Sequence, residues 1–339
     1  MMSNLNTTQH LYEKLNNVNV NNNTYDYDFC ESITDIVDEI NELKKKKNAV
    51  VLSHSYLHPE ILVSVSDYVG DSYELSKRAQ EAKSDIIVFA AVRFMAETAK
   101  LLNPTKKVLF PNRNGGCSLA DAINGEKMRK LKAQFPEHTF VCYINTTADV
   151  KAECDVCVTS SNVYKIIEKI PNNKIFFVPD RLMGLNIIDH CIKNNIKKEI
   201  QVYDGTCYVH EEYDPDLINY WRKKVDNLYV LAHPECSPEI IRQADYVGST
   251  SGMLQQVKNL NHTNYLMLTE CGLISRLQTE ISPEKKFIGT CMKCKYMKSN
   301  TLKDIKRVLE YPQASDEILI PDDIAQKAVK CINKMFEYA

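Results

Sequence analysis

The sequence predicts an α/β protein built from three repeated α/β units. Two observations carry this prediction: short apolar runs alternate with longer amphipathic segments, and the runs fall into three sets of four. The first runs of the sets begin at residues 50, 140 and 228, which are 90 and 88 residues apart. A fixed period of this length indicates an internal repeat. We therefore expect three pseudo-symmetric α/β domains, each a parallel sheet sandwiched by helices.

Each apolar run is expected to form one strand, and each segment between two runs a crossover helix. The strands of the first set are expected at 50–54, 67–71, 85–89 and 107–110. Those of the second set are expected at 140–144, 155–159, 174–178 and 199–203. Those of the third set are expected at 228–232, 245–249, 264–268 and 286–289. The same tetrapeptide, Asp-Tyr-Val-Gly, stands at 67–70 and 245–248, which supports the repeat.

The ends of the chain lie outside the repeat. Residues 1–28 are rich in Asn and have no apolar period, so we expect a disordered tail. Four lysines at 44–47 are expected at the solvated end of a helix before the first strand. The three domains are expected at 29–118, 119–207 and 208–310, and the C-terminal helix in 311–339 is expected to join the first.

Composition excludes several classes of protein. The 339 residues carry 42 basic and 44 acidic side chains, a net charge of −2, which argues against a nucleic-acid partner. No apolar run approaches ~18 residues, so no membrane span is expected. The N-terminus has neither a secretion-signal layout nor an Arg-rich transit pattern. We expect a cytoplasmic protein, or alternatively a plastid stromal one, whose twelve cysteines are thiols or metal ligands.

Polar side chains follow the first strand of every set, where open α/β sheets bind their ligands. They are His54, Ser55 and Tyr56, then Tyr143 and Asn145, then His233 and Glu235. Histidine, tyrosine and glutamate are residue types that transfer protons near neutral pH. A single histidine in such a place is more often structural, but three matching strand ends favour a site.

Small hydroxyl residues follow the second strand of every set. They include Ser72, Ser160, Ser249 and Thr250, and each group precedes a helical segment. Hydroxyls and free N–H groups at helix starts bind carboxylate or phosphate, although simple helix capping is the alternative. Three such turns favour an anionic substrate with several charged groups. Neither GxxxxGK[ST] nor GxGxxG occurs, so a nucleotide fingerprint lacks support.

The fourth strand of every set leads to a cysteine. The candidates are Cys117, Cys207 and, in the third set, Cys291 or Cys294. Three thiolates meeting on a three-fold axis suit an iron–sulfur cluster with one open iron, or a zinc ion with an open position. Independent buried cysteines are the alternative. The pair Cys154 and Cys157 is discounted as a metal-binding pair because a helix-to-strand junction separates its side chains.

Several motifs distributed along the chain together resemble a known family. They occupy residues 53–60, 67–76, 94–104, 116–121, 143–146, 159–162, 207–210, 231–236, 248–253, 294–302 and 317–325. Through them, residues 31–339 resemble the NadA family of quinolinate synthases. The resemblance implies three pseudo-symmetric α/β domains around a central [4Fe–4S] cluster.

The resemblance also implies an activity. Members of this family condense iminosuccinate (iminoaspartate) with dihydroxyacetone phosphate to give quinolinate, with release of phosphate and water, which builds the pyridine ring of NAD. The implied upstream partner is an L-aspartate oxidase or dehydrogenase that supplies iminosuccinate. By motif, Cys117, Cys207 and Cys294 hold three irons, and the fourth iron acts as a Lewis acid.

Further roles carry over residue by residue. Substrate contacts are implied for His54, Ser72, Tyr143, Asn145, Ser160, His233, Glu235, Ser249 and Thr250. Tyr56 and Glu235, together with His210, are the implied proton-transfer groups. The internal repeat points to Cys291 as the third ligand, whereas the family motif points to Cys294. We choose Cys294 and expect Cys291 to be a redox partner or an inert neighbour.

Three other functions remain open at this stage. A non-catalytic iron–sulfur sensor would use Cys291 and Cys294 as a redox switch, but it needs no polar pocket. An aconitase-like hydro-lyase would use an open iron but only one substrate. A zinc hydrolase would contain no acid-labile sulfide.

Overall fold

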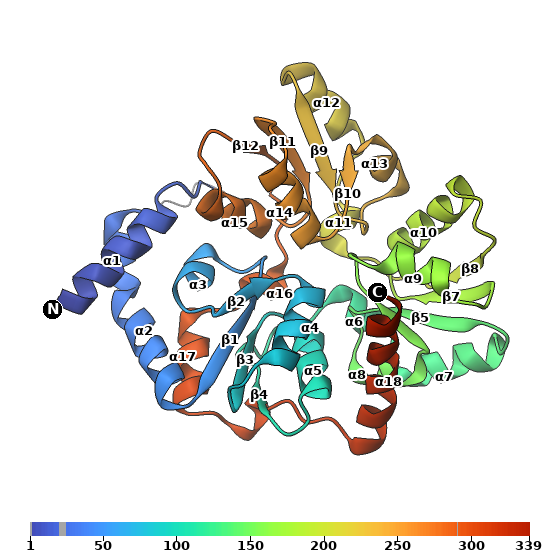
Figure 1. The fold of residues 1–339 in the computed structure, drawn as a ribbon, viewed down its shortest axis with the longest axis horizontal. Coiled ribbons are helices and arrows are strands. Elements are labelled where there is room, and N and C mark those ends of the chain that lie inside the picture. The colour runs from blue at the N-terminus through green and yellow to red at the C-terminus, as the bar shows by residue number, and fades with distance from the viewer. Residues whose placement is uncertain (1, 20–24, 290) are drawn as a thin grey trace.

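The computed structural model describes residues 2–19, 25–289 and 291–339, which form three four-stranded parallel sheets (Figure 1). The first sheet contains β1 (Ala49–His54), β2 (Tyr68–Gly70), β3 (Ile86–Ala90) and β4 (Lys107–Leu109). The second contains β5 (Thr139–Tyr143), β6 (Val156–Val158), β7 (Lys174–Val178) and β8 (Glu199–Val202). The third contains β9 (Leu228–Ala232), β10 (Tyr246–Val247), β11 (Asn264–Leu268) and β12 (Lys286–Ile288). Every predicted strand is confirmed to within a few residues.

Helices join the strands as crossovers. Those of the first unit are α2 (Tyr27–Lys46), α3 (Pro59–Ser64), α4 (Ser72–Glu81) and α5 (Arg93–Leu102). Those of the second are α6 (Ser118–Ala122), α7 (Gly125–Gln134), α8 (Ala148–Glu153), α9 (Val163–Lys169) and α10 (Arg181–Lys193). Those of the third are α11 (Tyr208–Glu211), α12 (Asp216–Lys224), α13 (Pro238–Gln243), α14 (Thr250–Asn259) and α15 (Gly272–Glu280). The strand order is second-first-third-fourth in each sheet, which confirms three repeats of one topology.

One aspartate makes the same contacts in each unit. Asp67, Asp155 and Asp245 each accept a hydrogen bond from a backbone N–H of the neighbouring first strand, at 2.7, 2.7 and 2.8 Å. Each also pairs with a basic side chain from the helix before that strand, at 2.9, 3.8 and 3.1 Å. The first of these partners is Lys44 of the four-lysine run, which forms the end of α2 as predicted. The repeat therefore extends to individual hydrogen bonds.

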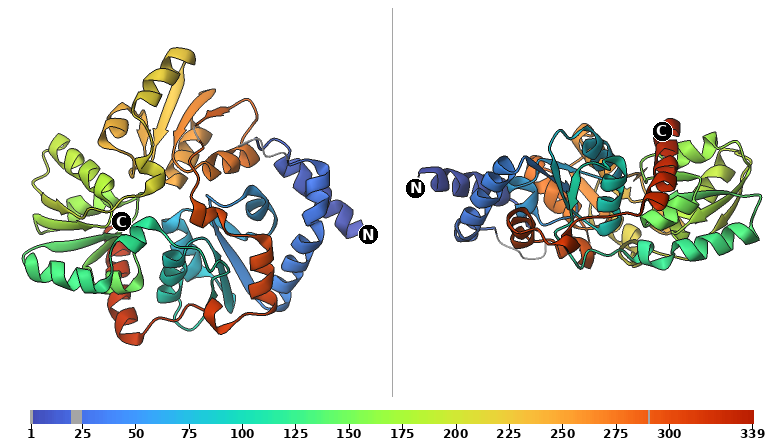
Figure 2. Two further views of the ribbon diagram at one scale, coloured as in Figure 1. Left: turned by 180° about the vertical axis from the view of Figure 1, so that it is seen from behind. Right: turned by 90° about the horizontal axis from the view of Figure 1, so that it is seen from below.

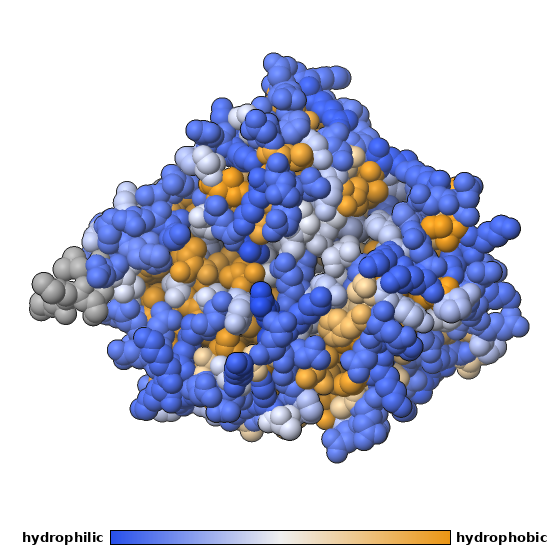
Figure 3. All heavy atoms as spheres, viewed as in Figure 1, coloured by the Kyte–Doolittle hydropathy of each residue, from blue (hydrophilic) through white to orange (hydrophobic). Residues whose placement is uncertain are grey.

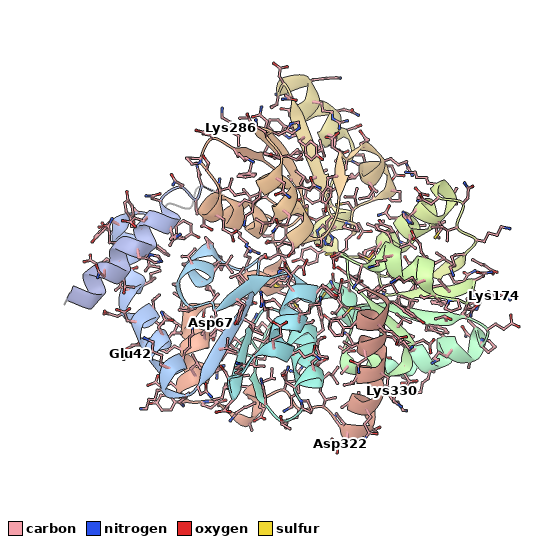
Figure 4. All side chains as sticks on the ribbon, in the orientation of Figure 1. Glu42, Asp67, Lys174, Lys286, Asp322 and Lys330 are labelled. Atoms are coloured by element: carbon pink, nitrogen blue, oxygen red, sulfur yellow. A yellow bond between two sulfur atoms is a disulfide. The ribbon has the colours of Figure 1, made fainter. Side chains whose placement is uncertain are left out.

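The three units surround a common centre in one flat layer (Figure 2). Lys174 and Lys286, which begin β7 and β12, lie toward the outer edge in Figure 4, so these strands run inward. The carboxyl ends of the strands consequently face the centre, where parallel sheets place their ligands.

The outer surface is mostly hydrophilic, and hydrophobic residues gather away from the tips of the units (Figure 3). One buried apolar cluster extends through all three units, and a smaller one lies in the third unit around Val230 and Leu266. Among the described helices, none is both long enough and apolar enough to cross a lipid bilayer.

The prediction of a disordered tail is wrong for the described part of residues 1–28. Residues 2–15 form helix α1 (Met2–Leu15), which packs against α2 and α3. Leu11 and Leu15 are buried, and Thr8 Oγ1 lies 2.7 Å from Thr34 Oγ1 of α2. Burial of these few apolar side chains stabilises a helix whose own sequence is polar. Residues 1 and 20–24 of the expected tail lie outside the described residues.

The prediction for the C-terminal helix is also wrong. After α16 (Lys295–Lys298), helix α17 (Leu302–Glu310) packs against α2 and β3 of the first unit. A short 3₁₀ helix, η1 (Ala314–Asp316), leads to α18 (Asp322–Tyr338), which packs mainly against α8 and β6 of the second unit (Figure 1). Its amphipathic pattern predicts a buried face but cannot identify which sheet buries it. The domain boundaries at 118/119, 207/208 and 310/311 stay predictions.

Candidate active site

One cavity of about 670 Å³ lies where the three units meet. The predicted site residues that line it are His54, Tyr56, Ser72, Cys117, Tyr143, Asn145, Ser160, Cys207, His210, His233, Glu235, Thr250 and Cys294. Ser249 is not among the described lining residues. It is buried at the start of α14, where its side chain accepts a hydrogen bond from Gly252 N at 3.2 Å. The strand ends of all three sheets thus contribute to a single site, as the repeat predicts.

The three predicted ligand cysteines share one local geometry. Among the described free cysteines, Cys117, Cys207 and Cys294 are partly exposed, whereas the other seven are buried. Each of the three stands immediately before a short helix, α6, α11 or α16, and caps no backbone N–H with its side chain. A thiol at a helix start faces free N–H groups, which favour the thiolate that binds metals.

Burial works against ionisation of these thiols. It raises the pKa of Cys117 to about 12, and it also raises the pKa of Cys207 and of Cys294. A bound cation reverses this balance, because its charge stabilises the thiolate. Three thiols that face one cavity, from three equivalent positions, therefore fit a soft metal centre or an iron–sulfur cluster.

Cys291 differs from the three ligand candidates. It forms a disulfide with Cys271, with a Cα–Cα distance of 5.1 Å, so the expectation that every cysteine is a thiol or a metal ligand is wrong here. Cys294, rather than Cys291, occupies the position before a short helix that Cys117 and Cys207 also occupy. The structure thus favours the motif-based choice over the repeat-based one. Thr290, which completes the repeated Gly-Thr-Cys triplet, lies outside the described residues.

Glu235 is the centre of a buried polar network. Tyr143 donates its hydroxyl hydrogen to Glu235 Oε1 at 2.7 Å, and His210 Nδ1 lies 2.8 Å from Glu235 Oε2. Burial alone favours the neutral acid. The neighbouring His210 and His233, with the hydrogen bonds from His210 and Tyr143, nevertheless hold the Glu235 pKa below its usual value. Glu235 is therefore a carboxylate that only accepts hydrogen bonds.

His54 and His233 occupy equivalent positions in the first and third units. In each case Nδ1 accepts a hydrogen bond from a backbone N–H two residues on, that of Tyr56 at 3.2 Å and that of Glu235 at 3.3 Å. Burial lowers the pKa of both histidines to about 3, so both are neutral near pH 7. Because Nδ1 accepts, Nε2 carries the proton and acts as a donor.

Tyr56 has the opposite character to Glu235. Its hydroxyl lies 2.7 Å from Thr269 Oγ1 and accepts a hydrogen bond from Thr250 Oγ1 at 3.1 Å. Burial raises its pKa well above the usual value, so the phenol keeps its proton. The cavity therefore holds a carboxylate and a protonated phenol, which is the pairing needed for acid–base chemistry.

Sequence reasoning missed the residues that follow the third strands. Thr269 and Glu270 follow β11, and Asp180 follows β7 by one residue. Glu270 is fully buried and accepts a hydrogen bond from Cys294 N at 3.2 Å, while Lys298 Nζ lies 3.3 Å from it. The signal was present, because the strand-end rule applied to the first, second and fourth strands also selects these positions.

A second grouping of potential ligands lies in the same cavity. Cys207, His210 and Glu235 offer one sulfur, one nitrogen and one oxygen within 4.8 Å of one another. His210 Nδ1 is 3.3 Å from Cys207 Sγ. This mixed donor set suits a single borderline metal such as zinc, whereas the three cysteines suit a cluster.

Acidification is expected to destabilise the protein through His54. Its folded pKa of about 3 lies below the model value of 6.5, so between these values the unfolded chain binds more protons. Stability should therefore fall as the pH falls from 6.5 toward 3. For cluster-free protein in reducing buffer, His54→Gln should shrink the pH 7 to pH 5 difference in unfolding free energy by about 2 kcal/mol. Urea unfolding at both pH values measures this, and an unchanged difference would contradict the buried neutral imidazole.

Comparison with known proteins assigns the chain to a family model. Residues 38–337 match the model described as "NadA: Quinolinate synthetase A protein". A quinolinate synthase of Alkaliphilus metalliredigens is 39% identical over 306 residues, which cover 90% of this chain and 98% of that relative. A quinolinate synthase of Aquifex aeolicus is 40% identical, covering 91% and 95%. One of Clostridium novyi is 42% identical, covering 89% and 98%.

A solved structure also shows a distant likeness. It is the E-1-hydroxy-2-methyl-but-2-enyl-4-diphosphate reductase of Plasmodium falciparum, 14% identical over 76% of this chain and 87% of that one, with a TM-score of 0.29. A TM-score this low carries no conclusion about fold or function.

Proposed function

This chain belongs to the quinolinate synthetase A (NadA) family of NAD biosynthesis, and on that premise we propose its substrates, cofactor and residue roles. The proposed reaction condenses iminosuccinate with dihydroxyacetone phosphate to quinolinate, and it releases one phosphate and two waters. The observation that carries the proposal is the convergence of three partly exposed cysteines and the Glu235 network on one cavity.

The proposed cofactor is a [4Fe–4S] cluster held by Cys117, Cys207 and Cys294. Support comes from the chemistry of the donors: these three described thiols differ from the buried ones in facing the cavity from equivalent positions. When bound, a cluster with three protein ligands supplies a Lewis-acidic iron that polarises an oxygen of the substrate.

The chain's own groups are proposed to bind the charged ends of both substrates. These substrates carry carboxylates and a phosphate, which accept hydrogen bonds. The Nε2–H groups of His54 and His233 are neutral donors, and Ser72, Asn145, Ser160 and Thr250 supply further donors on the cavity wall. Donors from three separate sheets are expected to hold the two reacting carbons close together.

Proton transfer is proposed to fall to Glu235 and Tyr56. Condensation requires a base that removes a proton from the carbon beside the imine, and an acid that protonates a departing hydroxyl. Glu235 is ionised and buried, so it suits the first role. Tyr56 keeps its proton and suits the second. His210 contacts Glu235 and orients its carboxylate.

The nature of iminosuccinate limits its source. An imine of an amino acid forms when the amine carbon is oxidised, so the supplier must be an oxidoreductase such as an L-aspartate oxidase or dehydrogenase. Free ligand thiols further favour a reducing compartment, which the cytoplasm and the plastid stroma both provide.

The decisive experiment combines metal analysis with product analysis. Iron, acid-labile sulfide and zinc are measured per chain after strictly anaerobic purification, and quinolinate is then assayed with both substrates and with each alone. We expect about four irons and four sulfides, with quinolinate only when both substrates are present. Zinc without sulfide would point to the Cys207, His210 and Glu235 grouping and contradict the cluster. A full cluster without quinolinate would favour an iron–sulfur sensor, and turnover of a single substrate a hydro-lyase.

A further inference from the structure

We propose that Thr269 is a positioning residue, which fixes the Tyr56 hydroxyl and the His210 imidazole relative to each other through one buried hydroxyl. The inference rests on the proposed function, because it assigns Thr269 a part in the reaction at that site. Thr269 is the residue directly after β11, and 1% of its surface is exposed. Its Oγ1 lies 2.7 Å from the Tyr56 hydroxyl and 3.1 Å from His210 Nε2.

The hydrogen bonds around Thr269 form one chain with a defined direction. Glu235 has no hydrogen to give, so His210 donates from Nδ1 to Glu235 Oε2, at 2.8 Å. His210 Nε2 then accepts, and its donor is the Thr269 hydroxyl. At the other end, Thr250 donates to the Tyr56 oxygen, which directs the Tyr56 hydrogen to Thr269. A threonine hydroxyl accepts one bond and donates another, so it completes this chain with no group left unpaired.

The chain joins groups from different units. Tyr56 follows β1 of the first unit, Thr269 follows β11 of the third, and His210 lies in α11 beside Cys207. The backbone of Thr269 is itself anchored, because the Tyr213 hydroxyl donates to its carbonyl oxygen. Thr269 therefore sets the position of the proposed acid, Tyr56, and the tautomer of the group that orients the proposed base, Glu235.

Substitutions at residue 269 separate this role from packing. Thr269→Val keeps the shape and removes the hydroxyl, whereas Thr269→Ser keeps the hydroxyl and removes a methyl group. We expect Thr269→Val to lower kcat about 10- to 100-fold with little change in KM, and Thr269→Ser to remain near wild type. The iron and sulfide content of both variants should equal that of wild type. If Thr269→Val fails to fold, Thr269→Ala, which also lacks the hydroxyl, takes its place.

A double-mutant cycle tests whether Thr269 acts through Tyr56. In a Tyr56→Phe background the hydroxyl partner is already missing, so Thr269→Val should cost much less than it does alone. Thr34→Val is the matched control, because Thr34 is also buried, at 2% exposed, and uses its hydroxyl twice, with Thr8 and with the Cys30 carbonyl. This control should keep full kcat.

Each outcome decides a different statement. Full kcat in Thr269→Val, additive losses in the cycle, or a loss that Thr269→Ser does not relieve would overturn the role of Thr269. Absence of quinolinate formation by the wild-type enzyme in the same assay would instead overturn the proposed function. The wild-type measurement therefore distinguishes the two failures.

Discussion

Replacing Cys294 with alanine is expected to yield a protein that retains no iron–sulfur cluster, and the same is expected for Cys117 and Cys207. A cluster with three protein ligands that loses one thiolate keeps only two attachments, and thiolates are the groups that hold such clusters. Each variant is purified anaerobically, and iron, sulfide and the visible absorption of the cluster are measured. We expect iron and sulfide to fall from about four per chain to near zero.

Cys291→Ala and Cys271→Ala are the matched controls for this prediction. Both residues lie in the same region as Cys294, but they bond to each other rather than face the cavity as free thiols. Both variants should keep the cluster. If Cys291→Ala loses it while Cys294→Ala keeps it, the third ligand is the residue that the internal repeat indicated. If all three ligand variants keep it, the three-cysteine site is wrong.

Glu235→Gln is expected to lower kcat about 10²- to 10⁴-fold, the range typical of a lost acid–base group. Glutamine has the size of glutamate but one acceptor oxygen in place of two. The Tyr143 hydroxyl and His210 Nδ1 both donate to Glu235, at 2.7 and 2.8 Å, so one of them must lose its acceptor. The variant also lacks the basic carboxylate itself. Steady-state kinetics with both substrates, together with iron analysis, measure the effect.

Glu239→Gln provides the control for Glu235→Gln. Glu239 lies four residues further on, in α13, with its side chain 58% exposed and paired to Arg242 on the surface. An exposed pair of this kind contributes little, so this variant should keep wild-type kinetics. If Glu235→Gln keeps full kcat with a full cluster, the proton-transfer role of Glu235 is excluded. A loss of cluster in Glu235→Gln alone would assign Glu235 to the metal site.

The sequence was sufficient for the sheets because each parallel strand is buried and therefore uniformly apolar. The runs at 140–144 and 174–178, for example, correspond to β5 and β7. It was also sufficient for most of the cavity wall, since carboxyl ends of parallel strands converge whatever the details of packing. Cys117, Cys207 and Cys294 meet in the cavity for this reason.

What the sequence could not supply was the choice of partner for a surface. Leu11 and Leu15 of α1 look like isolated leucines in a polar segment until α2 and α3 are in place beside them. Helix α18 has a clear apolar face, but nothing local indicates that α8 and β6 cover it. Thr269 has the same limitation, because its significance lies in Tyr56 and His210, which are distant in the sequence.

The route of the last 38 residues determines when this protein can mature during its synthesis. The third proposed ligand, Cys294, is followed by α17, which returns to the first unit, and by α18, which returns to the second. A ribosome-bound chain therefore has neither a complete set of thiols nor the helices that close the three units together. We expect cluster insertion to await release of the finished polypeptide, so the machinery that delivers iron and sulfide must act on a folded acceptor rather than on a nascent one.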